Sequence, residues 1–267
     1  MKKLIFSLAF LLLSVFSIQA QTEEKLNTGN ASIYLCTDYN NETGNFTKLF
    51  NGFKGKGTST FKVVIFIQDF KPDVVHKLQI KIVDPEATNI LGNQSSSFIL
   101  KSNTYQHIHR QNTNATFVLE GVYQVQAWVD GKFVQYFNFY VGNSVAKNDS
   151  EGNVAMVVCT DYDGNNNNIS GIIMGLKKPE TRETLLLVRL QDFPLNEVNK
   201  AVVKLISPSG ENVLIKKEAT FTHGNSSNLH YYSKRTTIEF SESGVYQFQV
   251  EVNGKIVQYL NFSVGAN

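Results

Sequence analysis

Residues 244–254 read GVYQFQVEVNG. From Tyr246 to Val252, apolar side chains alternate with polar ones, which is the period of a β-strand with one buried face. The Asn-Gly pair at 253–254 favours a two-residue turn, because its positive φ angles match the twist of the strands on either side. Residues 256–264 then return as a second strand, so the stretch predicts a β-hairpin.

The same hairpin occurs 123 positions earlier in the chain, where residues 121–131 read GVYQVQAWVDG. Other segments recur at the same spacing without any net insertion, and about a third of the aligned positions are identical. Chance does not produce such identity over more than a hundred residues, so the sequence contains one domain written twice. The recurring segments are CTDY at 36–39 and 159–162, QDF at 68–70 and 191–193, Pro85 and Pro208, and VQY at 134–136 and 257–259.

The repeat boundaries predict two domains of about 112 residues each. No helical stretch of convincing length is found, so seven to nine short strands in each copy are expected to form an antiparallel β-sandwich. The predicted segments are an N-terminal extension at 21–30, the first domain at 31–142, a polar linker at 143–153 and the second domain at 154–267. Besides the hairpin, the strands predicted in the first copy are 32–38, 61–68, 77–83 and 116–119, with shorter ones from 89 to 109.

The hairpin also predicts a local irregularity. A two-residue turn pairs Ala127 with Val134, which places Val134 on the core face. Strict alternation would then point three apolar side chains, from Phe137 onward, away from the core that they favour. We therefore predict a β-bulge near 135–136 that shifts the phase, and an equivalent bulge near 258–259.

Two segments, Gly244-Val245-Tyr246 and Gly121-Val122-Tyr123, open the penultimate strand of each copy. They are similar to the segment of immunoglobulin-type domains in which the tyrosine hydroxyl bonds back to the backbone, the tyrosine corner. Val125 and Phe248 replace the disulfide cysteine of antibody domains, so the resemblance is closer to disulfide-free immunoglobulin-like and fibronectin type III variants. It implies an all-β fold of two tandem immunoglobulin-like antiparallel β-sandwich domains, and it implies no biochemical activity.

The first twenty residues are typical of an export signal. Lys2 and Lys3 precede an apolar stretch at 4–16, and Ala20 supplies a small residue at the cleavage edge, so Gln21 is the expected mature N-terminus. The alternative, a membrane anchor, needs about 18 or more apolar residues, and this stretch is shorter. We expect a periplasmic or secreted protein with no transmembrane segment in the mature chain.

Removal of the signal leaves a chain with 23 basic and 23 acidic residues. This neutral balance gives no electrostatic reason to expect nucleic acid or an anionic membrane as a partner. Cys36 and Cys159 occupy the same position in the two copies, so neither domain can form its own disulfide. We expect two separate buried thiols, and the alternative is a bridge between the domains or between molecules.

Binding residues are predicted on the outward face of the hairpin. Trp128 is expected to project there beside Phe133, and an exposed aromatic pair can anchor an interface. The alternative is that the pair packs against the linker, the sister domain or a covering loop. The glutamines expected to face each other on the same side are Gln126 with Gln135 and Gln249 with Gln258.

One loop has the composition of a calcium site. Residues 161–168 read DYDGNNNN, and alternating Asp and Asn oxygens can bind this ion, here through Asp161, Asp163 and Asn165. The alternative is an ordinary turn, because Asn and Asp are common turn residues. No other cofactor is predicted.

Two further patterns have plain interpretations. His107 and His109 alternate along a predicted strand, but zinc needs two more converging ligands, so surface histidines are expected. Asn-x-Ser/Thr triplets would be glycan acceptors only in a eukaryotic secretory protein. They occur, for example, at Asn45, Asn114, Asn168, Asn225 and Asn261.

No arrangement of residues predicts a catalytic site, because nucleophilic catalysis needs a nucleophile, a base and an orienting group together. We expect a non-enzymatic exported binding or adaptor protein of a bacterial cell envelope, which presents two similar β-sandwich faces to a protein or glycan partner. One alternative is a structural spacer or assembly subunit that acts by strand addition or like a two-domain chaperone. The other alternative is a secreted enzyme with an unrecognised site.

Overall fold

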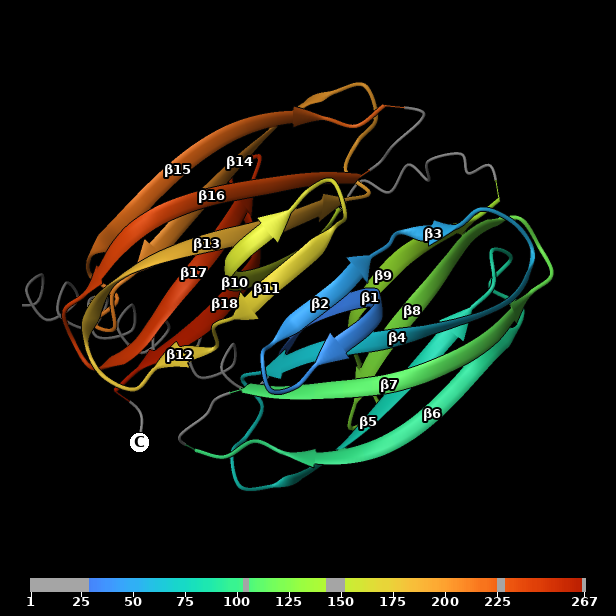
Figure 1. Cartoon of the computed structure of the whole chain (residues 1–267), viewed down its shortest axis with the longest axis horizontal. Coiled ribbons are helices and arrows are strands. Elements are labelled where there is room, and N and C mark those ends of the chain that lie inside the picture. The colour runs from blue at the N-terminus through green and yellow to red at the C-terminus, as the bar shows by residue number, and fades with distance from the viewer. Residues whose placement is uncertain (1–28, 103–105, 143–151, 225–228, 266–267) are drawn as a thin grey trace, which may run out of the picture.

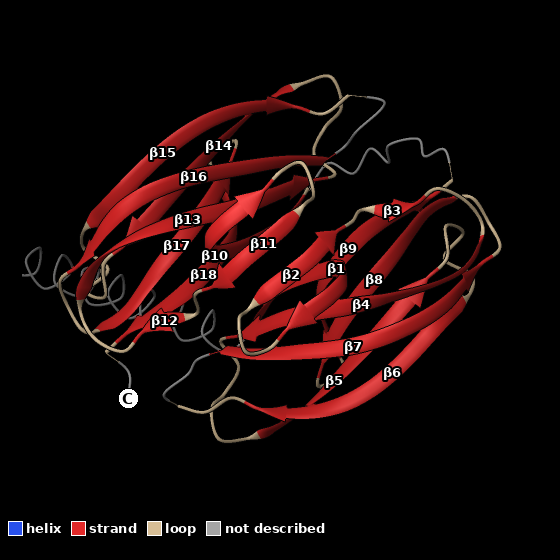
Figure 2. Ribbon diagram, viewed as in Figure 1, coloured by secondary structure: helices blue, strands red, loops and turns tan. Residues whose placement is uncertain are grey.

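The computed structural model describes residues 29–102, 106–142, 152–224 and 229–265. These residues form strands, turns and loops, without a helix among them (Figure 2). No helix capable of crossing a membrane is therefore found in this part of the chain. The all-β fold class is confirmed. The predicted export signal and most of the predicted linker lie outside the described residues.

Each copy of the repeat contributes nine strands to the described chain, within the expected range of seven to nine. The first copy holds β1 (Asn30–Asn40), β2 (Asn45–Leu49), β3 (Gly52–Phe53), β4 (Gly57–Gln68), β5 (Val75–Val83), β6 (Ile90–Ile99), β7 (Gln106–Phe117), β8 (Gly121–Val129) and β9 (Lys132–Val141). The second copy holds β10 (Asn153–Asp163), β11 (Asn168–Ile172), β12 (Gly175–Leu176), β13 (Glu180–Gln191), β14 (Val198–Ile206), β15 (Val213–Thr222), β16 (Leu229–Phe240), β17 (Gly244–Val252) and β18 (Lys255–Val264).

Some predicted strand limits are wrong. The segment at 116–119 is not a strand of its own, because its first two residues complete the long strand β7. The short strands β2 and β3 are not predicted, since five and two residues are too few for a clear alternation. β1 begins at Asn30 and β10 at Asn153, each one residue before the predicted start of its domain.

The strands form three sheets (Figure 1). One has eight strands in the order β16-β13-β10-β11-β2-β1-β4-β7, and the five-stranded sheets have the orders β12-β18-β17-β14-β15 and β3-β9-β8-β5-β6. The strand pairs are antiparallel apart from β3 with β9 and β12 with β18, which are parallel. Each five-stranded sheet packs on one half of the eight-stranded sheet. Two sandwiches therefore lie side by side and join where β2 meets β11.

Three hydrophobic clusters fill the molecule. One lies inside each sandwich, where Val125 and Phe139 belong to the first and Phe248 and Phe262 to the second. The third lies between the sandwiches. Its members in the first copy include Tyr34, Cys36, Phe46, Val64 and Phe66, and those in the second include Val157, Cys159, Ile169, Leu185 and Leu187.

The third cluster shows that the two copies also share an apolar contact with each other. Strands β4 and β13 are buried on both faces, so one face packs inside its sandwich and the other packs against the sister repeat. The continuous apolar runs VVIFI at 63–67 and LLLV at 185–188 are typical of such doubly covered strands.

The tyrosine corner is present in both copies. The Tyr123 hydroxyl donates to the Leu119 carbonyl oxygen at 3.0 Å, and the Tyr246 hydroxyl donates to the Glu242 carbonyl oxygen at 3.2 Å. Each hydroxyl also accepts a hydrogen bond from a backbone N–H, that of Leu119 at 3.2 Å in the first copy and that of Glu242 at 3.1 Å in the second. One hydroxyl thus satisfies two backbone groups, and the immunoglobulin-like resemblance is confirmed at the level of the fold.

Replacing Tyr246 by phenylalanine is expected to lower the free energy of unfolding by about 1–3 kcal/mol. Both backbone groups of Glu242 lose their partner, while the packing of the ring on Phe240 is kept. Chemical denaturation of the variant and the parent measures the change. Tyr123→Phe is the matched variant of the first copy and should lose a similar amount. Unchanged stability in both variants would contradict the prediction.

The predicted bulge is present in the first hairpin, one residue nearer to the turn than expected. Trp128 pairs with Phe133 and Ala127 pairs with Gln135, so Val134 is the extra residue. The backbone N–H of Tyr136, next to the bulge, donates to Gln135 Oε1 at 2.9 Å. A glutamine side chain therefore satisfies a backbone group beside the irregularity.

This register corrects the predicted pairs of glutamines. Gln126 lies opposite Tyr136, and Gln249 lies opposite Tyr259. The second hairpin has the same shift, since its extra residue is Val257. The glutamines that alternation alone placed opposite them, Gln135 and Gln258, pair with Ala127 and Val250 instead.

A buried histidine is tied to the turn of the first hairpin. His76 Nδ1 lies 2.7 Å from Asp130 Oδ2, and His76 Nε2 lies 2.8 Å from the Lys71 carbonyl oxygen. The equivalent positions in the second copy hold Asn199 and Asn253, whose amides hydrogen bond at 2.9 Å. Burial raises the pKa of the Asp130 carboxyl, but hydrogen bonds from His76 and the backbone outweigh it and hold this pKa below its usual value.

The lowered pKa of Asp130 predicts a loss of stability in acid. Its carboxylate stabilises the fold above the pKa that it has in the unfolded chain, and the contribution is lost as the pH falls through the lower folded-state value. Thermal melting from about pH 6 to about pH 2 should therefore show a smaller acid-induced fall for Asp130→Asn than for the parent. His76→Asn with Asp130→Asn recreates the amide pair of the second copy and serves as the control. Equal acid-induced falls in Asp130→Asn and the parent would contradict the prediction.

Candidate binding cleft between the repeats

The two copies meet through an antiparallel junction between β2 and β11. Phe46 pairs with Ile169, which is its own counterpart 123 residues later in the sequence. Antiparallel pairing of equivalent residues is the arrangement that a local two-fold axis between the copies requires. The other backbone contacts are reciprocal as well, with Leu49 N–H donating to the Asn167 carbonyl oxygen at 2.8 Å and Ile172 N–H donating to the Gly44 carbonyl oxygen at 3.3 Å.

Asparagine side chains close this junction. Asn45 Oδ1 accepts from the Gly171 N–H and Asn168 Oδ1 accepts from the Lys48 N–H, each at 2.7 Å. Asn45 and Asn168 begin two of the Asn-x-Ser/Thr triplets, and Asn261, which begins a third, is buried. At these positions the asparagine serves the contact between the repeats.

The last strand of each copy has an edge that β3 or β12 covers only near its end. Uncovered edges leave backbone groups in need of partners. On β18, amide side chains of the first copy supply them. Asn30 Nδ2 and Gln68 Nε2 donate to the Tyr259 carbonyl oxygen at 2.7 and 2.8 Å. Gln68 Oε1 accepts from the Asn261 N–H at 3.0 Å, and Gln106 donates to the Asn261 carbonyl oxygen.

Strand β9 of the first copy is closed in the same way. Asn153 Nδ2 donates to the Tyr136 carbonyl oxygen and Gln191 Nε2 donates to the Asn138 carbonyl oxygen, both at 2.6 Å. Gln191 is the counterpart of Gln68 in the repeated QDF segment. The glutamine of this segment therefore replaces a neighbouring strand for the other copy and holds the two copies together.

The aspartates of the two QDF segments differ in their surroundings. Both have positive φ angles, 60° at Asp69 and 62° at Asp192, a conformation that aspartate tolerates better than most residues. Asp192 is completely buried and Oδ2 accepts from Asn138 Nδ2 at 2.6 Å. Asp69 accepts from Asn261 Nδ2 but stays partly exposed, because it borders a cleft.

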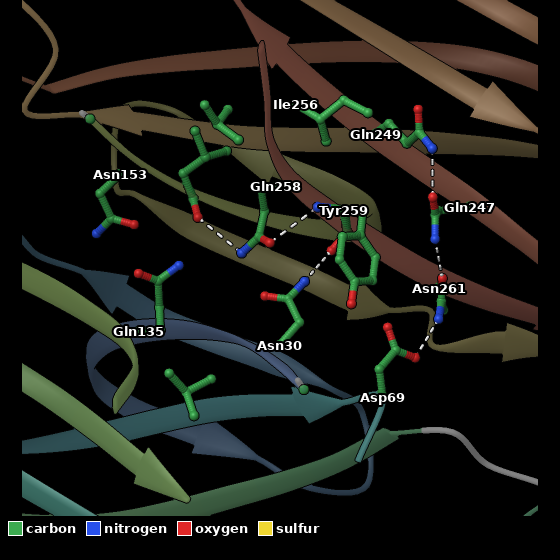
Figure 3. A pocket seen from close by; sticks show the side chains of 15 residues that line it. Asn30, Asp69, Gln135, Asn153, Gln247, Gln249, Ile256, Gln258, Tyr259 and Asn261 are labelled. Carbon is green, nitrogen blue, oxygen red and sulfur yellow. Dashed lines mark hydrogen bonds between the residues drawn. The ribbon is translucent and has the colours of Figure 1, made fainter. Parts of the chain in front are cut away.

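This cleft, of about 650 Å³, opens between the repeats beside the closed edges (Figure 3). Its walls come from both copies, and its volume is in the range of small-molecule sites. Seven amide side chains line it, together with four aliphatic residues, two glycines, Tyr259 and the single carboxylate Asp69. None of the described residues that line it is basic. The amides are Asn30, Gln135, Asn153, Gln247, Gln249, Gln258 and Asn261.

A row of amides leads along one wall to the carboxylate (Figure 3). Gln249 Nε2 donates to Gln247 Oε1 at 2.6 Å, Gln247 Nε2 donates to Asn261 Oδ1 at 3.0 Å, and Asn261 donates to Asp69. Each amide in this row donates to the next group in the direction of Asp69. The carbonyl oxygen of Gln249, at the far end of the row, receives no hydrogen bond from another described residue.

Two other polar groups define the chemistry of the cleft. Asn153 is 4% exposed, and its Oδ1 has no hydrogen-bond partner among the described residues, although Nδ2 is bonded. Burial raises the pKa of the Asp69 carboxyl, and hydrogen bonding from Tyr259 and Asn261 offsets this only in part. Burial and the neighbouring Asp69 raise the pKa of the Tyr259 hydroxyl, so it stays protonated. Of the two amide oxygens without a donor among the described residues, Asn153 Oδ1 is enclosed and Gln249 Oε1 belongs to the lining of the cleft.

The predicted binding residues fall into two places. Three glutamines line the cleft, and the other three residues lie on the outer face of the first repeat, away from the cleft lining. Those in the cleft are Gln135, Gln249 and Gln258. Those on the outer face are Gln126, Trp128 and Phe133.

The aromatic face, defined by Trp128, Phe133 and Tyr136, lies on the first hairpin. The rings of Trp128 and Phe133 are 5.5 Å apart in an edge-to-face arrangement, so their predicted side-by-side placement is confirmed. Phe133 is 48% exposed, and Tyr136 stacks on it at 6.3 Å. Lys81 Nζ lies 4.2 Å from the centre of the Trp128 ring, and Trp128 Nε1 donates to Gln126 Oε1 at 3.0 Å.

The residues predicted to bind calcium lie at the β10–β11 turn. Asp163 Oδ1 accepts from the Asn165 N–H at 2.9 Å, and Asp161 pairs with Arg235 at 2.7 Å. These bonds are those of an ordinary turn and an exposed ion pair. No group of three or more His, Cys, Asp or Glu side chains that could hold a metal is found in the described part of the chain. Calcium binding by these residues stays a prediction.

Both cysteines are free and buried in the third cluster, so the bridge given as an alternative is not formed between them. Burial raises the pKa of the Cys36 and Cys159 thiols to about 12. The thiolate is the nucleophilic form, so neither side chain is activated for catalysis. His107 stacks on Phe98 at 5.0 Å, and its ring lies 6.5 Å from that of His109.

Sequence reasoning identifies the QDF segment only as a marker of the repeat and does not predict the cleft. The available signal was the position of the segment, since Gln68 and Asp69 directly follow an apolar strand in both copies. Repeated polar residues at that point indicate a shared contact. Asn30 and Asn153 give a weaker signal, because each lies in a polar stretch that is typical of a linker.

No protein-family model matches the sequence, and no curated protein matches it. Among solved structures, the chain is similar to a transglutaminase from red sea bream, with 10% identity and a TM-score of 0.27 over 83% of this chain and 31% of that one. It is also similar to a glycosyl hydrolase family 2 member from Bacteroides cellulosilyticus, with 9% identity and a TM-score of 0.33 over 78% and 28%.

A third similar structure is a bacterial adhesin from Mobiluncus mulieris that contains intramolecular disulfide, isopeptide and ester cross-links. It has 8% identity and a TM-score of 0.28, over 84% of this chain and 80% of the adhesin. The chain spans less than a third of the first two proteins and about four fifths of the adhesin. At these TM-scores the matches carry no argument about function.

Proposed function

We propose that this chain is an exported, non-enzymatic binding protein of a bacterial cell envelope, and that its ligand is a glycan held in the cleft between the repeats. The observation that carries the proposal is the closure of β9 and β18 by amides of the opposite copy. These contacts set both walls of the cleft in place before a ligand arrives, which lowers the ordering cost of binding. Export is supported by the predicted signal at 1–20.

The lining suits a glycan. Amide side chains donate and accept hydrogen bonds, which matches sugar hydroxyls, and the aliphatic residues Val134, Val154 and Ile256 can contact the C–H groups of a sugar ring. Neutral side chains also avoid the large desolvation cost of burying several charges. A protein partner would need a contact surface of roughly 800 Å² on each side, which is more than a cleft of this size offers.

Catalysis finds little support in the cleft. Acid–base cleavage of a glycosidic bond uses a pair of carboxyl groups, and Asp69 is the single carboxylate among the described lining residues. The Tyr259 hydroxyl has a raised pKa and does not ionise near neutral pH. Binding is therefore the function that this set of side chains supports best.

Binding of the mature chain to an array of bacterial and plant glycans tests the proposal. Ile256→Trp adds bulk at a half-exposed position in the cleft and should abolish binding to any glycan that the parent retains. Phe133→Trp changes the counterpart position on the other hairpin, outside the cleft lining, and should leave binding unchanged. Absence of any bound glycan, or binding that survives Ile256→Trp, would overturn the proposal.

The aromatic face favours a second candidate, an adaptor that contacts a protein partner. Trp128 and Phe133 form a partly exposed pair of the kind that anchors interfaces, and Glu251 and Ile256 replace them in the second copy. Cross-linking pull-down from the native envelope, followed by mass spectrometry, should then identify a protein that is lost with Trp128→Ala and kept with Ile256→Trp. If the parent and Trp128→Ala pull down the same set of proteins, this candidate is excluded.

A further inference from the structure

Asp69 and Asp192 are counterparts in the repeated QDF segment, but the charged residues around them differ. Asp192 is completely buried. Burial lowers the pKa of the Arg189 guanidinium, and its electrostatic interactions with Tyr231, Tyr34 and Asp192 offset this only in part. Arg189 is 2% exposed and lies on β13 of the same copy. The position equivalent to Arg189 in the first copy, 123 residues earlier, is Phe66. Among the described residues, Asp69 therefore has no counterpart of Arg189.

No other described residue that lines the cleft makes up for this difference. Asp69 is bonded by the neutral groups of Tyr259 and Asn261, and none of the described lining residues is basic. Partial burial of a carboxylate without a cation is costly, and the raised pKa of Asp69 reflects that cost. A positive charge placed in the cleft would compensate the carboxylate of Asp69.

One acceptor elsewhere in the cleft, Gln249 Oε1, has no hydrogen-bond donor among the described residues. Gln249 is the counterpart of Gln126 in the first copy. There, Gln126 Oε1 accepts a hydrogen bond from the indole N–H of Trp128. In the second copy Glu251 stands at the tryptophan position and pairs with Lys204, so the indole donor is missing.

We propose that the cleft selects a hydroxylated primary amine, of the kind presented by a non-acetylated amino sugar in a glycan, with its ammonium group at Asp69. A hydroxyl group of the same ligand donates to Gln249 Oε1. This proposal rests on the proposed function, because it assumes that the cleft is the glycan site. It adds the charge that the ligand must carry.

The same arrangement disfavours other ligands. An anionic sugar would bring a second negative charge to Asp69 without a basic residue in the lining to balance it. N-acetylation of the amino sugar removes the positive charge and replaces a compact donor with a larger neutral amide. Both changes should therefore weaken binding.

Isothermal titration of the mature chain with two matched trisaccharides tests the proposal. One is the β-1,4-linked trimer of glucosamine, at a pH where its amines are protonated, and the other is its fully N-acetylated form. The amine trimer should bind at least about 10-fold more tightly than the acetylated one. Asp69→Asn keeps an acceptor oxygen toward Asn261, removes the charge, and should reduce this preference to near unity.

Asp192→Asn is the matched control, because it changes the counterpart aspartate outside the cleft and should keep the preference for the amine trimer. Melting curves verify that both variants are folded. Equal or tighter binding of the acetylated trimer by the parent would overturn the amine proposal and leave the glycan site standing. Failure of both trimers, with neutral or acidic glycans bound on the array, would overturn it as well. An array without any bound glycan would instead remove the proposed function itself.

Discussion

Gln68→Ala is expected to lower the free energy of unfolding by about 3 kcal/mol, a large effect for a single polar side chain. Gln68 is 5% exposed, and its amide serves two backbone groups of the opposite copy, the Tyr259 carbonyl and the Asn261 N–H. Loss of the side chain leaves the buried Asn261 N–H without this partner and opens a gap at the edge of β18. Denaturant unfolding, followed by tryptophan fluorescence and circular dichroism, measures the loss.

Gln191→Ala provides the internal comparison. Gln191 donates to the Asn138 carbonyl oxygen, but its own Oε1 has no partner among the described residues, so it satisfies fewer groups than Gln68. Its replacement should cost about 1 kcal/mol. The order of the two losses matters more than their size. If Gln191→Ala cost more than Gln68→Ala, side-chain amides would not be closing the strand edges in the way described.

The second large effect is expected at Arg189. Its Nη1 donates to the Ile33 carbonyl oxygen at 2.8 Å, and its guanidinium lies 4.0 Å from the centre of the Phe137 ring. Arg189→Met keeps much of the volume but leaves Asp192 as a buried carboxylate without its nearby cation. We expect a loss of about 3 kcal/mol, because an uncompensated buried charge is strongly destabilising.

The double variant Arg189→Met with Asp192→Asn separates charge from packing. Neutralising both partners should recover most of the lost stability, since a neutral amide does not need the cation. Denaturant unfolding of the four proteins in this cycle gives the coupling free energy between the two positions. A coupling near zero would mean that Arg189 does not compensate Asp192, and the comparison with Asp69 would lose its basis.

The fold was largely predictable because its signals are local. Alternation from Tyr246 to Val252, the Asn-Gly turn and the Gly-x-Tyr segment each act within a few residues, and each is found in the structure. The bulge was predicted from the apolar phase of the returning strand, and only its position was wrong. Alternation indicates that the phase must change but does not say where, and Val134 and Val257 decide it.

The contact between the copies was not predictable in the same way. A glutamine that closes a strand edge 191 residues away, as Gln68 does for the Tyr259 carbonyl, has no local pattern. Strands buried on both faces do leave a trace in the run at 63–67, but that run is equally typical of a strand inside one sandwich. Long-range partners of this kind follow from the tertiary arrangement and not from spacing.

The candidate site was likewise predictable only in part. Gln135, Gln249 and Gln258 were predicted as binding residues on the outward face of the hairpins, and all three line the cleft. The predicted face is wrong for Gln135 and Gln258, which pair with the buried Ala127 and Val250, and binding by these residues stays a prediction. Asp69 was not predicted, because its importance depends on the absence of a cation that its counterpart has. That difference becomes visible only when Phe66 and Arg189 are compared in their buried positions.

The reciprocity of the contacts has a consequence for the origin of the chain. A homodimer of single repeats would make isologous contacts of the kind seen here. Phe46 pairs with its counterpart Ile169, Gln68 bonds to β18 of the second copy, and Gln191 bonds to β9 of the first. One repeat therefore encodes a self-complementary surface, and fusing two genes would free that surface from dependence on protein concentration. Fusion also allows the halves to diverge, which an obligate homodimer cannot do. The unequal surroundings of Asp69 and Asp192 are a difference that two identical subunits could not have.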